Sequence, residues 1–216
     1  MEYGKNNIKT IAFTGMMAAL VLAGSMIEIR LGEMRFHLGN GLALLSGIFL
    51  GAVNGGLASG IGSLFFDLFF YPSTPVGYII TFISKFLMGF VAGGVFDLLE
   101  RRNVNDWVCA AFGGLLGEAA YLAVYLGKHY ITQVYVLGAS KEAAAGIIWA
   151  KLISGSVNAV IAIIISGLLY QVLKPVFDRI GISHGSAMND EKTSQLSAGN
   201  RLQTIEKKNT ERGEND

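Results

Sequence analysis

Long apolar stretches separated by short polar connections run along most of this 216-residue chain. A membrane-spanning α-helix needs roughly 20 apolar residues to cross a hydrocarbon layer about 30 Å thick. Four of the stretches approach or exceed that length, and two are shorter. The pattern predicts an all-α integral membrane protein with six transmembrane helices, over residues 8–27, 38–53, 55–70, 76–99, 108–126 and 143–173.

The second and third stretches are rich in glycine and are separated only by Asn54-Gly55, which is a turn signal. We therefore expect a tight hairpin of two short spans. Glycines recur four residues apart at Gly51/Gly55 and Gly56/Gly60. This small-xxx-small spacing lets helix backbones approach closely within a bilayer, so the sequence predicts a closely packed bundle.

Between the first two spans, apolar and polar residues alternate on both sides of Gly32-Glu33. Alternation is typical of β-strands, and a two-residue loop that begins with glycine suits a type II′ hairpin turn. The predicted register pairs Leu31 with Met34, Ile29 with Phe36 and Arg30 with Arg35. Two interpretations stay open: the hairpin is a lid across the outer mouth of the bundle, or it is an ordinary amphipathic connector.

The composition agrees with a bilayer location, because 52% of the residues are hydrophobic and only 15% are charged. A net charge of +1 provides no concentrated basic surface for nucleic acid. The side that holds the termini carries the larger set of basic residues, which are Lys5, Lys9, Arg101, Arg102, Lys174 and Arg179. The opposite side has Arg30, Arg35, Lys128 and Lys141. Positive charge favours the cytoplasm, so we expect a multi-pass protein of the cell membrane with both termini cytoplasmic.

The composition changes after the last span. Residues 183–216 are rich in Ser, Asn, Lys, Glu and Gly and contain few large apolar side chains. Such a segment buries too little apolar surface to offset the entropy of ordering it. The sequence therefore predicts a six-helix membrane domain over residues 1–182 and a disordered cytoplasmic tail over residues 183–216.

Four ionisable residues lie inside the predicted spans, namely Asp67, Lys85, Glu118 and Lys151. A charge in hydrocarbon costs at least a few kcal/mol, so such a residue normally faces the bundle interior and marks a functional site. Counted from the outer helix ends, Asp67 lies roughly 5 Å deep and the other three lie roughly 12 to 14 Å deep. Two negative and two positive charges cancel, which favours a neutral polar ligand of vitamin size. Asp67 and Lys151 suit a structural role equally well.

Further candidate binding residues accompany these charges, namely Tyr121, Tyr125, Trp149 and Asn158. Tyr121 and Tyr125 follow Glu118 on one face of the fifth span, and Asn158 lies seven residues after Lys151 on the sixth. Aromatic walls with a few hydrogen-bonding groups are typical of pockets for planar heterocycles. The alternative is that these aromatic side chains form the belt at the membrane interface.

The sequence offers little for catalysis or for metal binding. Cys109 is the single cysteine and lies in an apolar run, so we expect a small buried residue instead of a disulfide or zinc ligand. We place His37 and His129 in outer loops and His184 in the tail, which makes no His-rich site. We also find no G-x-x-x-x-G-K-[ST] segment, so ATP would have to be bound by partner subunits. We expect no enzyme activity, no cofactor and no metal.

Several segments resemble the riboflavin-type S components of energy-coupling-factor (ECF) transporters. They are Leu38-Gly39-Asn40, Gly51, residues 56–62, Asp67 and the run Ile83-Ser84-Lys85-Phe86-Leu87-Met88-Gly89. The resemblance covers residues 8 to about 175 and implies six membrane helices, a cytoplasmic N-terminus and a vitamin site on the outer side. Members of that family often have Gly-Asp where this chain has Gly39-Asn40, so an amide replaces a carboxylate at this candidate binding position.

The resemblance also implies a function and partners. An S component captures a water-soluble vitamin or precursor, such as riboflavin, pyridoxine or a hydroxymethylpyrimidine. Uptake is then driven by a transmembrane coupling subunit and, through it, by two ATPase subunits. Gly15, Ala19 and Ala23 on the first helix match the stripe of small residues that contacts the coupling subunit in the family. A self-sufficient, ion-coupled secondary transporter of a small polar solute remains the alternative.

Overall fold

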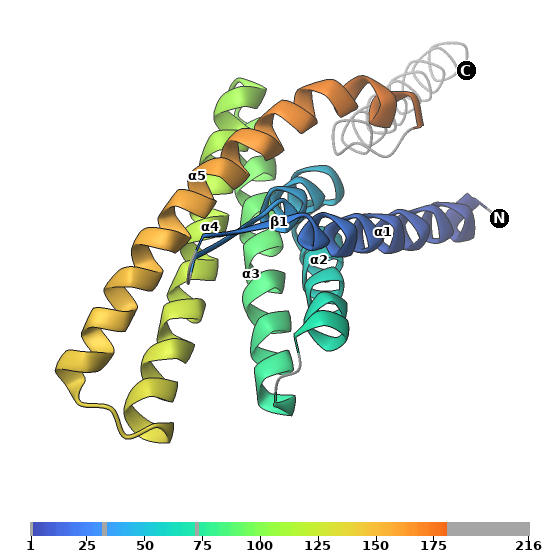
Figure 1. Cartoon of the computed structure of the whole chain (residues 1–216). Helices are drawn as coiled ribbons and strands as arrows, with labels where there is room; N and C mark the ends of the chain where they lie inside the picture. The colour runs from blue at the N-terminus through green and yellow to red at the C-terminus, as the bar shows by residue number, and fades with distance from the viewer. Residues whose placement is uncertain (1, 32–33, 72–73, 181–216) are drawn as a thin grey trace, which may run out of the picture.

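The computed structural model of the protein describes residues 2–31, 34–71 and 74–180. Within them, five helices are long and apolar enough to cross a membrane (Figure 1). The helices are α1 Glu2–Met26, α2 Gly39–Phe70, α3 Pro75–Glu100, α4 Asp106–Ile131 and α5 Lys141–Ile180. A β-hairpin of β1 Glu28–Leu31 and β2 Met34–His37 follows α1, and a π-helical turn, η1 Thr132–Val136, follows α4. The predicted tail over residues 183–216 lies outside the described residues.

Helix α2 doubles back on itself at Gly51. That residue has φ 76° and ψ −177°, a conformation that glycine tolerates because it has no Cβ. The Ser46 hydroxyl donates a hydrogen bond of 3.0 Å to the carbonyl of Gly55, although nine residues of straight helix would span about 13.5 Å. The two predicted short spans are therefore present as two halves of α2. The turn lies at Gly51 and not at Asn54-Gly55 as predicted.

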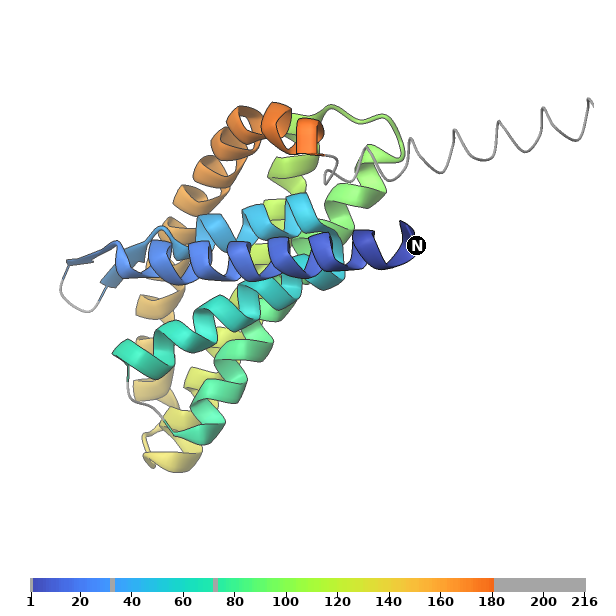
Figure 2. The same cartoon turned by 90° about the vertical axis from the view of Figure 1, so that its right-hand side faces the viewer.

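The chain runs back and forth between two ends of the molecule (Figure 2). We call the end with the β-hairpin, the last turn of α2 and η1 the hairpin end. The other end, which holds the start of α1, the connection from α3 to α4 and the last turns of α5, is the terminal end. Helix α3 packs between α2 and α4, and α5 packs against α2 and α4.

Small residues allow the central helices to pack closely. A Cβ built on Gly89 of α3 would lie 2.7 Å from the carbonyl oxygen of Gly55 in α2. One built on Gly117 of α4 would lie 2.7 Å from the carbonyl oxygen of Met88 in α3. Any larger residue at these positions would push the helix backbones apart. The predicted close packing is thus realised on both sides of α3.

Aromatic side chains fill the core at the terminal end. The rings of Phe49 and Phe177 stack with centroids 4.0 Å apart. Tyr170 lies 5.2 Å from Phe49 and 5.2 Å from Phe96 on its other side. This cluster joins α2, α3 and α5, and its four members are all at least 95% buried. Aromatic packing therefore joins the three helices at this end of the bundle.

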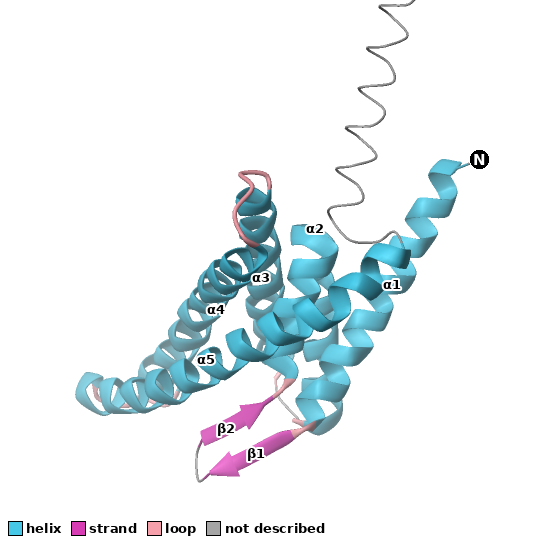
Figure 3. Cartoon of the chain, turned by 90° about the horizontal axis from the view of Figure 1, so that it is seen from above, coloured by secondary structure: helices cyan, strands magenta, loops and turns pink. Residues whose placement is uncertain are grey.

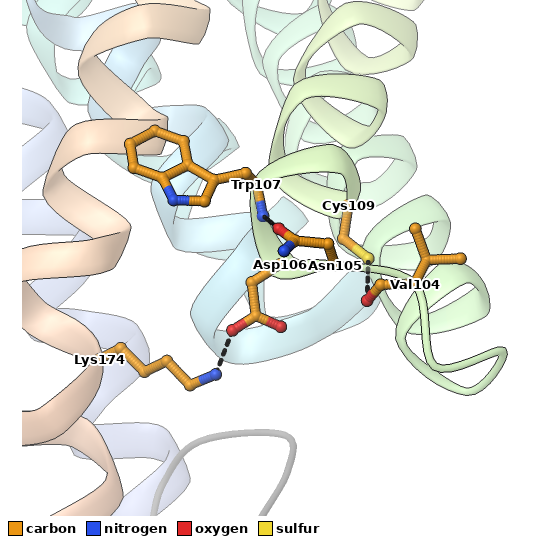
Figure 4. Close-up of polar contacts among 6 residues, drawn as sticks. All are labelled: Val104, Asn105, Asp106, Trp107, Cys109 and Lys174. Carbon is orange, nitrogen blue, oxygen red and sulfur yellow. Dashed lines mark hydrogen bonds and ion pairs between the residues drawn. The ribbon is translucent and has the colours of Figure 1, made fainter.

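Polar contacts join α4 and α5 at the same end (Figure 4). Asn105 caps α4, because its side-chain oxygen accepts a hydrogen bond of 2.9 Å from the backbone of Trp107. The Lys174 ammonium of α5 forms an ion pair with the carboxylate of Asp106. Cys109 is fully buried, as predicted, and its thiol lies 3.5 Å from the carbonyl of Val104.

The β-hairpin has the predicted register, with Ile29 opposite Phe36, Arg30 opposite Arg35 and Leu31 opposite Met34. The predicted turn, Gly32-Glu33, lies outside the described residues. Figure 3 shows the hairpin projecting from the end of α1 and running beside α5. The hydroxyl of Tyr71 donates a hydrogen bond of 2.7 Å to Glu28, which ties the hairpin to the end of α2. The role of the hairpin as a lid stays a prediction.

Candidate functional site

A cavity of about 870 Å³ opens among the helices toward the hairpin end. Its wall takes residues from all five helices, from β2 and from η1. The residues from α4 and α5 recur at intervals of three and four, so each helix presents one face to the cavity. This volume lies in the range of small-molecule sites.

Six of the nine predicted binding residues lie on this wall. They are Asp67, Lys85, Tyr121, Tyr125, Lys151 and Asn158. These side chains come from four different helices, α2 to α5, whose residues lie up to 91 positions apart, from Asp67 to Asn158. The structure therefore brings most of the predicted polar and aromatic groups to one place.

Two further predicted residues, Asn40 and Glu118, lie behind the wall and support Lys85. The amide nitrogen of Asn40 donates a hydrogen bond of 3.0 Å to Oε1 of Glu118. The amide oxygen of Asn40 accepts a hydrogen bond from the Lys85 ammonium. Asn40 and Glu118 are each 1% exposed and Lys85 is 6% exposed. The amide thus bridges a buried cation and anion, which is how a protein lowers the cost of removing both from water.

The deep end of the cavity combines a donor, an acceptor and an aromatic face. The Lys85 ammonium lies 4.0 Å from the centroid of the Tyr121 ring. Asn158 is 8% exposed, and within the described residues its side-chain oxygen is buried with no hydrogen-bond partner. A buried acceptor without a partner costs free energy that a donor from a ligand would recover. The deep end of the cavity is therefore lined by a lysine, an amide and an aromatic ring.

Aromatic rings continue the wall toward the hairpin end. Tyr121 and Tyr125 have ring centroids 5.5 Å apart and an interplanar angle of 26°. His129 meets Tyr125 edge to face at 4.5 Å. The Lys151 ammonium lies 5.9 Å from the Tyr125 ring. This row of rings gives the wall aromatic surface with cations beside it.

Asp67 occupies the wall opposite, where α2 and α3 meet. The Thr81 hydroxyl donates a hydrogen bond of 2.7 Å to its carboxylate. Ser63 and Ser84 add hydroxyl groups on the same two helices. Among the described lining residues, this side of the cavity has these hydrogen-bonding groups and Phe66 as its aromatic side chain.

Trp149 lies outside the cavity, in contrast to its predicted place in the pocket. Its side chain is 65% exposed, and Ala150 and Lys151 take the neighbouring wall positions. Residues two positions apart on an α-helix are separated by about 200° of rotation, so Trp149 and Lys151 project on nearly opposite sides of α5. Trp149 fits the alternative interpretation, an aromatic side chain at the membrane interface.

Several residues that line the wall near the hairpin end were not predicted as binding residues from the sequence, notably Lys128, His129 and Gln133. The predicted span ended at residue 126, whereas α4 continues to Ile131 and η1 follows it. His129 therefore lies in a helix and not in a loop, and His37 lies in β2. The helical spacing from Tyr121 through Tyr125 to Lys128 and His129 is the signal that would have identified them.

The wall also changes the predicted balance of charge. Glu118 lies behind it and Lys128 joins it, so three lysines face one aspartate among the described lining residues. The described part of the chain contains no group of three His, Cys, Asp or Glu side chains arranged to hold a metal ion.

The fold and the cavity define a multi-pass membrane protein with a solute-sized site near one end. A family model described as the S component of the ECF-type riboflavin transporter matches residues 5–175. The chain therefore belongs to the family of ECF-type riboflavin transporter S components. A solved S component of a bacterial ECF transporter has the same fold, with a TM-score of 0.60 and 16% identity over 79% of this chain and 98% of that one. Comparison with curated proteins found no match.

Proposed function

We propose that this protein captures a riboflavin-like vitamin from outside the cell and delivers it to an ATP-driven uptake complex. The observation that carries the proposal is the cavity of about 870 Å³ with Lys85 and Asn158 at its deep end and tyrosine rings along its side. The cavity end faces outward in this proposal, and both termini lie in the cytoplasm of a cell-membrane protein.

A flavin suits this combination of groups. Its flat ring system can lie against Tyr121 and Tyr125, where aromatic contact adds to the burial of apolar surface. The edge of the ring system carries carbonyl oxygens beside an N–H group. The carbonyl can accept a hydrogen bond from Lys85, and the N–H can donate one to the side-chain oxygen of Asn158, which has no partner among the described residues. A smaller pyridine or pyrimidine would leave much of the volume to water.

The aromatic cluster at the terminal end supports a protein that binds the vitamin but needs a partner to release it into the cell. Phe49, Phe96, Tyr170 and Phe177 are packed together and at least 95% buried there, so in this proposal a bound vitamin enters the cell only after a rearrangement. The sequence has no phosphate-binding motif for ATP, so the energy must come from other subunits. In this proposal a transmembrane coupling subunit and two ATPase subunits supply it.

The small residues of α1 are the proposed contact for the coupling subunit. Gly15, Ala19 and Ala23 are all exposed, and a Cβ built on Gly15 would meet no atom within 4 Å. An outward-facing stripe of small residues allows another helix to approach closely in a bilayer. We predict that Ala19→Trp abolishes vitamin uptake by cells that contain the partner subunits but leaves the affinity of the purified protein unchanged. Normal uptake by this variant would remove the stripe from the proposal, and Leu20→Trp on the adjacent face is the matched control.

Native mass spectrometry of the purified full chain, followed by titration with riboflavin, tests the proposal. We expect a copurified flavin and saturable binding at a 1:1 ratio. Asn158→Ala should weaken binding at least tenfold, about 1.4 kcal/mol, because it removes the acceptor at the deep end. No binding of riboflavin, or an unchanged titration curve for Asn158→Ala, would reject this site.

A further inference from the structure

The β-hairpin begins where α1 leaves the hydrocarbon layer of the membrane. The apolar part of α1, Ile8–Met26, has 19 residues, and a helix of that length spans roughly 29 Å. Because the hydrocarbon layer is about 30 Å thick, Met26 lies at its boundary or, if α1 is tilted, within it. Strand β1 starts at Glu28, directly after this point. The hairpin therefore starts in the interfacial region between hydrocarbon and water.

The two faces of the hairpin differ in chemistry. Successive residues of a strand point to opposite faces, and residues directly opposite in an antiparallel pair share one face. The register pairs Glu28 with His37 and Ile29 with Phe36. The face with Glu28 and His37 is turned toward the bundle, because Glu28 accepts the hydrogen bond from Tyr71 and His37 lines the cavity. The face with Ile29 and Phe36 is therefore the outer face of the hairpin.

Apolar side chains are exposed on this outer face and in the residues that lead to it. Ile29 is 64% exposed, and Met26 and Ile27 before it are each more than half exposed within the described part of the chain. A large apolar side chain in water forgoes the free energy that its burial would provide. The same side chain in contact with lipid does not. The exposed surface is also continuous along the chain with the membrane-spanning part of α1.

Other elements expose apolar side chains at the same end of the molecule. Phe69 in the last turn of α2 and Tyr135 and Val136 in η1 are each at least 65% exposed. Aromatic side chains are enriched where a membrane protein crosses the interface. A bilayer surrounds the molecule and can contact α2, η1 and the hairpin together, whereas a protein partner would cover one side. These observations favour lipid as the occupant of the outer face.

We propose that the β-hairpin is an interfacial membrane anchor. Its outer face, with Ile29, inserts into the lipid leaflet at the hairpin end, and its other face borders the cavity. The hairpin projects beyond α1 at this end of the molecule, as the insertion requires (Figure 3). It thus joins the wall of the cavity to the surrounding lipid. The proposal does not depend on which ligand the cavity binds.

Site-directed spin labelling of the full chain in phosphatidylcholine nanodiscs tests the proposal. Ile29→Cys is made in a Cys109→Ala background, because Cys109 is the only cysteine of the chain, and is labelled with a nitroxide. Power saturation then compares collisions of the label with oxygen, which concentrates in lipid, and with a nickel chelate, which stays in water. We expect the ratio of oxygen to nickel accessibility to be about threefold or more above that of a label in water, since interfacial insertion removes the side chain from water.

Glu142→Cys and Val157→Cys in the same background are the matched controls. Glu142 is exposed in the first turn of α5, so its label should report water. Val157 is exposed within the apolar part of α5, so its label should report lipid. A label at residue 29 that matches the label at residue 142 would overturn the proposal, because the hairpin would then lie in water. Low accessibility to both reagents would also overturn it, because protein would then cover the outer face.

Fluorescence quenching measures the depth of insertion independently. A bimane label at residue 29 should be quenched more by phosphatidylcholine brominated near the headgroup than by phosphatidylcholine brominated near the ends of the acyl chains, because interfacial insertion is shallow. No quenching by either lipid, or stronger quenching by the second, would overturn the interfacial position. If thermal unfolding shows that Cys109→Ala is unfolded, the labels are placed in the native background. Cys109 is fully buried there, and treatment of the unsubstituted protein measures any label that it takes up.

Discussion

The two ends of the bundle differ in whether their side chains find packing and hydrogen-bond partners within the protein. At the terminal end, aromatic rings fill the space between α2, α3 and α5, and Asp106 pairs with Lys174. At the hairpin end, the same helices enclose a cavity of about 870 Å³. There the side-chain oxygen of Asn158 has no hydrogen-bond partner among the described residues. Side chains of the protein fill the terminal end, whereas the hairpin end has space and polar groups for a ligand.

This difference explains how one fold can hold a polar site in a bilayer. The packed end holds together α2, α3 and α5, which also carry wall residues of the open end. Lys85 illustrates how packed residues support the site. Its side chain lines the cavity, its ammonium donates a hydrogen bond to Asn40, and Asn40 donates one to the buried Glu118. A rigid support of this kind reduces the reorganisation that binding requires.

The largest effect should come from opening the packed end. Phe49→Ala removes a ring that is 1% exposed and contacts both Tyr170 and Phe177. We expect the free energy of unfolding to fall by about 3 kcal/mol, because the neighbouring rings cannot fill the space. Thermal unfolding in detergent measures it. Phe65→Ala, which changes a ring that is 43% exposed on the bundle surface, is the control and should have little effect. Equal stability of the two variants would contradict the packed core.

A smaller but more specific effect should follow at the open end. Lys85→Ala removes the ammonium that faces the cavity and leaves Glu118 buried without its counter-charge. We expect riboflavin affinity to fall at least tenfold, about 1.4 kcal/mol, by calorimetric titration. Glu118→Gln keeps the hydrogen bond from Asn40 but removes the charge, so its effect on affinity should be smaller. Full affinity in Lys85→Ala would place the ligand away from the deep end.

Hydropathy and turn chemistry predicted the spans and the strand register because both depend on local spacing. The register of Ile29 with Phe36 follows from alternation and a two-residue turn. The turn at Gly51 was not predicted, because Asn54-Gly55 carries the stronger local signal. Its position depends on tertiary contacts such as the bond from Ser46 to the Gly55 carbonyl.

The depth of a charged residue in its span predicted that it belongs to the polar residues around the cavity. It did not predict whether the side chain lines the cavity or lies behind the lining residues. Lys85 and Glu118 were expected at a similar depth, yet only Lys85 reaches the cavity while Glu118 lies behind it. That distinction depends on the rotation of each helix about its axis, which packing sets. Lys128 was missed for a different reason, because α4 extends past the apolar stretch that marked its expected end.

The smallest effect should come from breaking the ion pair between Lys174 and Asp106 at the packed end. Lys174 is the lysine of that end to compare with Lys85 of the open end. Lys174→Ala also removes a lysine, but the side chains of Lys174 and Asp106 are 35% and 31% exposed, so water and salt already screen the pair. We expect a loss of stability of about 0.5 kcal/mol. Riboflavin affinity should not change, since neither residue lines the cavity. Thermal unfolding and titration of Lys174→Ala beside Lys85→Ala measure both quantities. Because the two variants remove the same chemical group, a fall in affinity for Lys174→Ala as large as for Lys85→Ala would mean that the two ends are coupled and that the packed end takes part in binding.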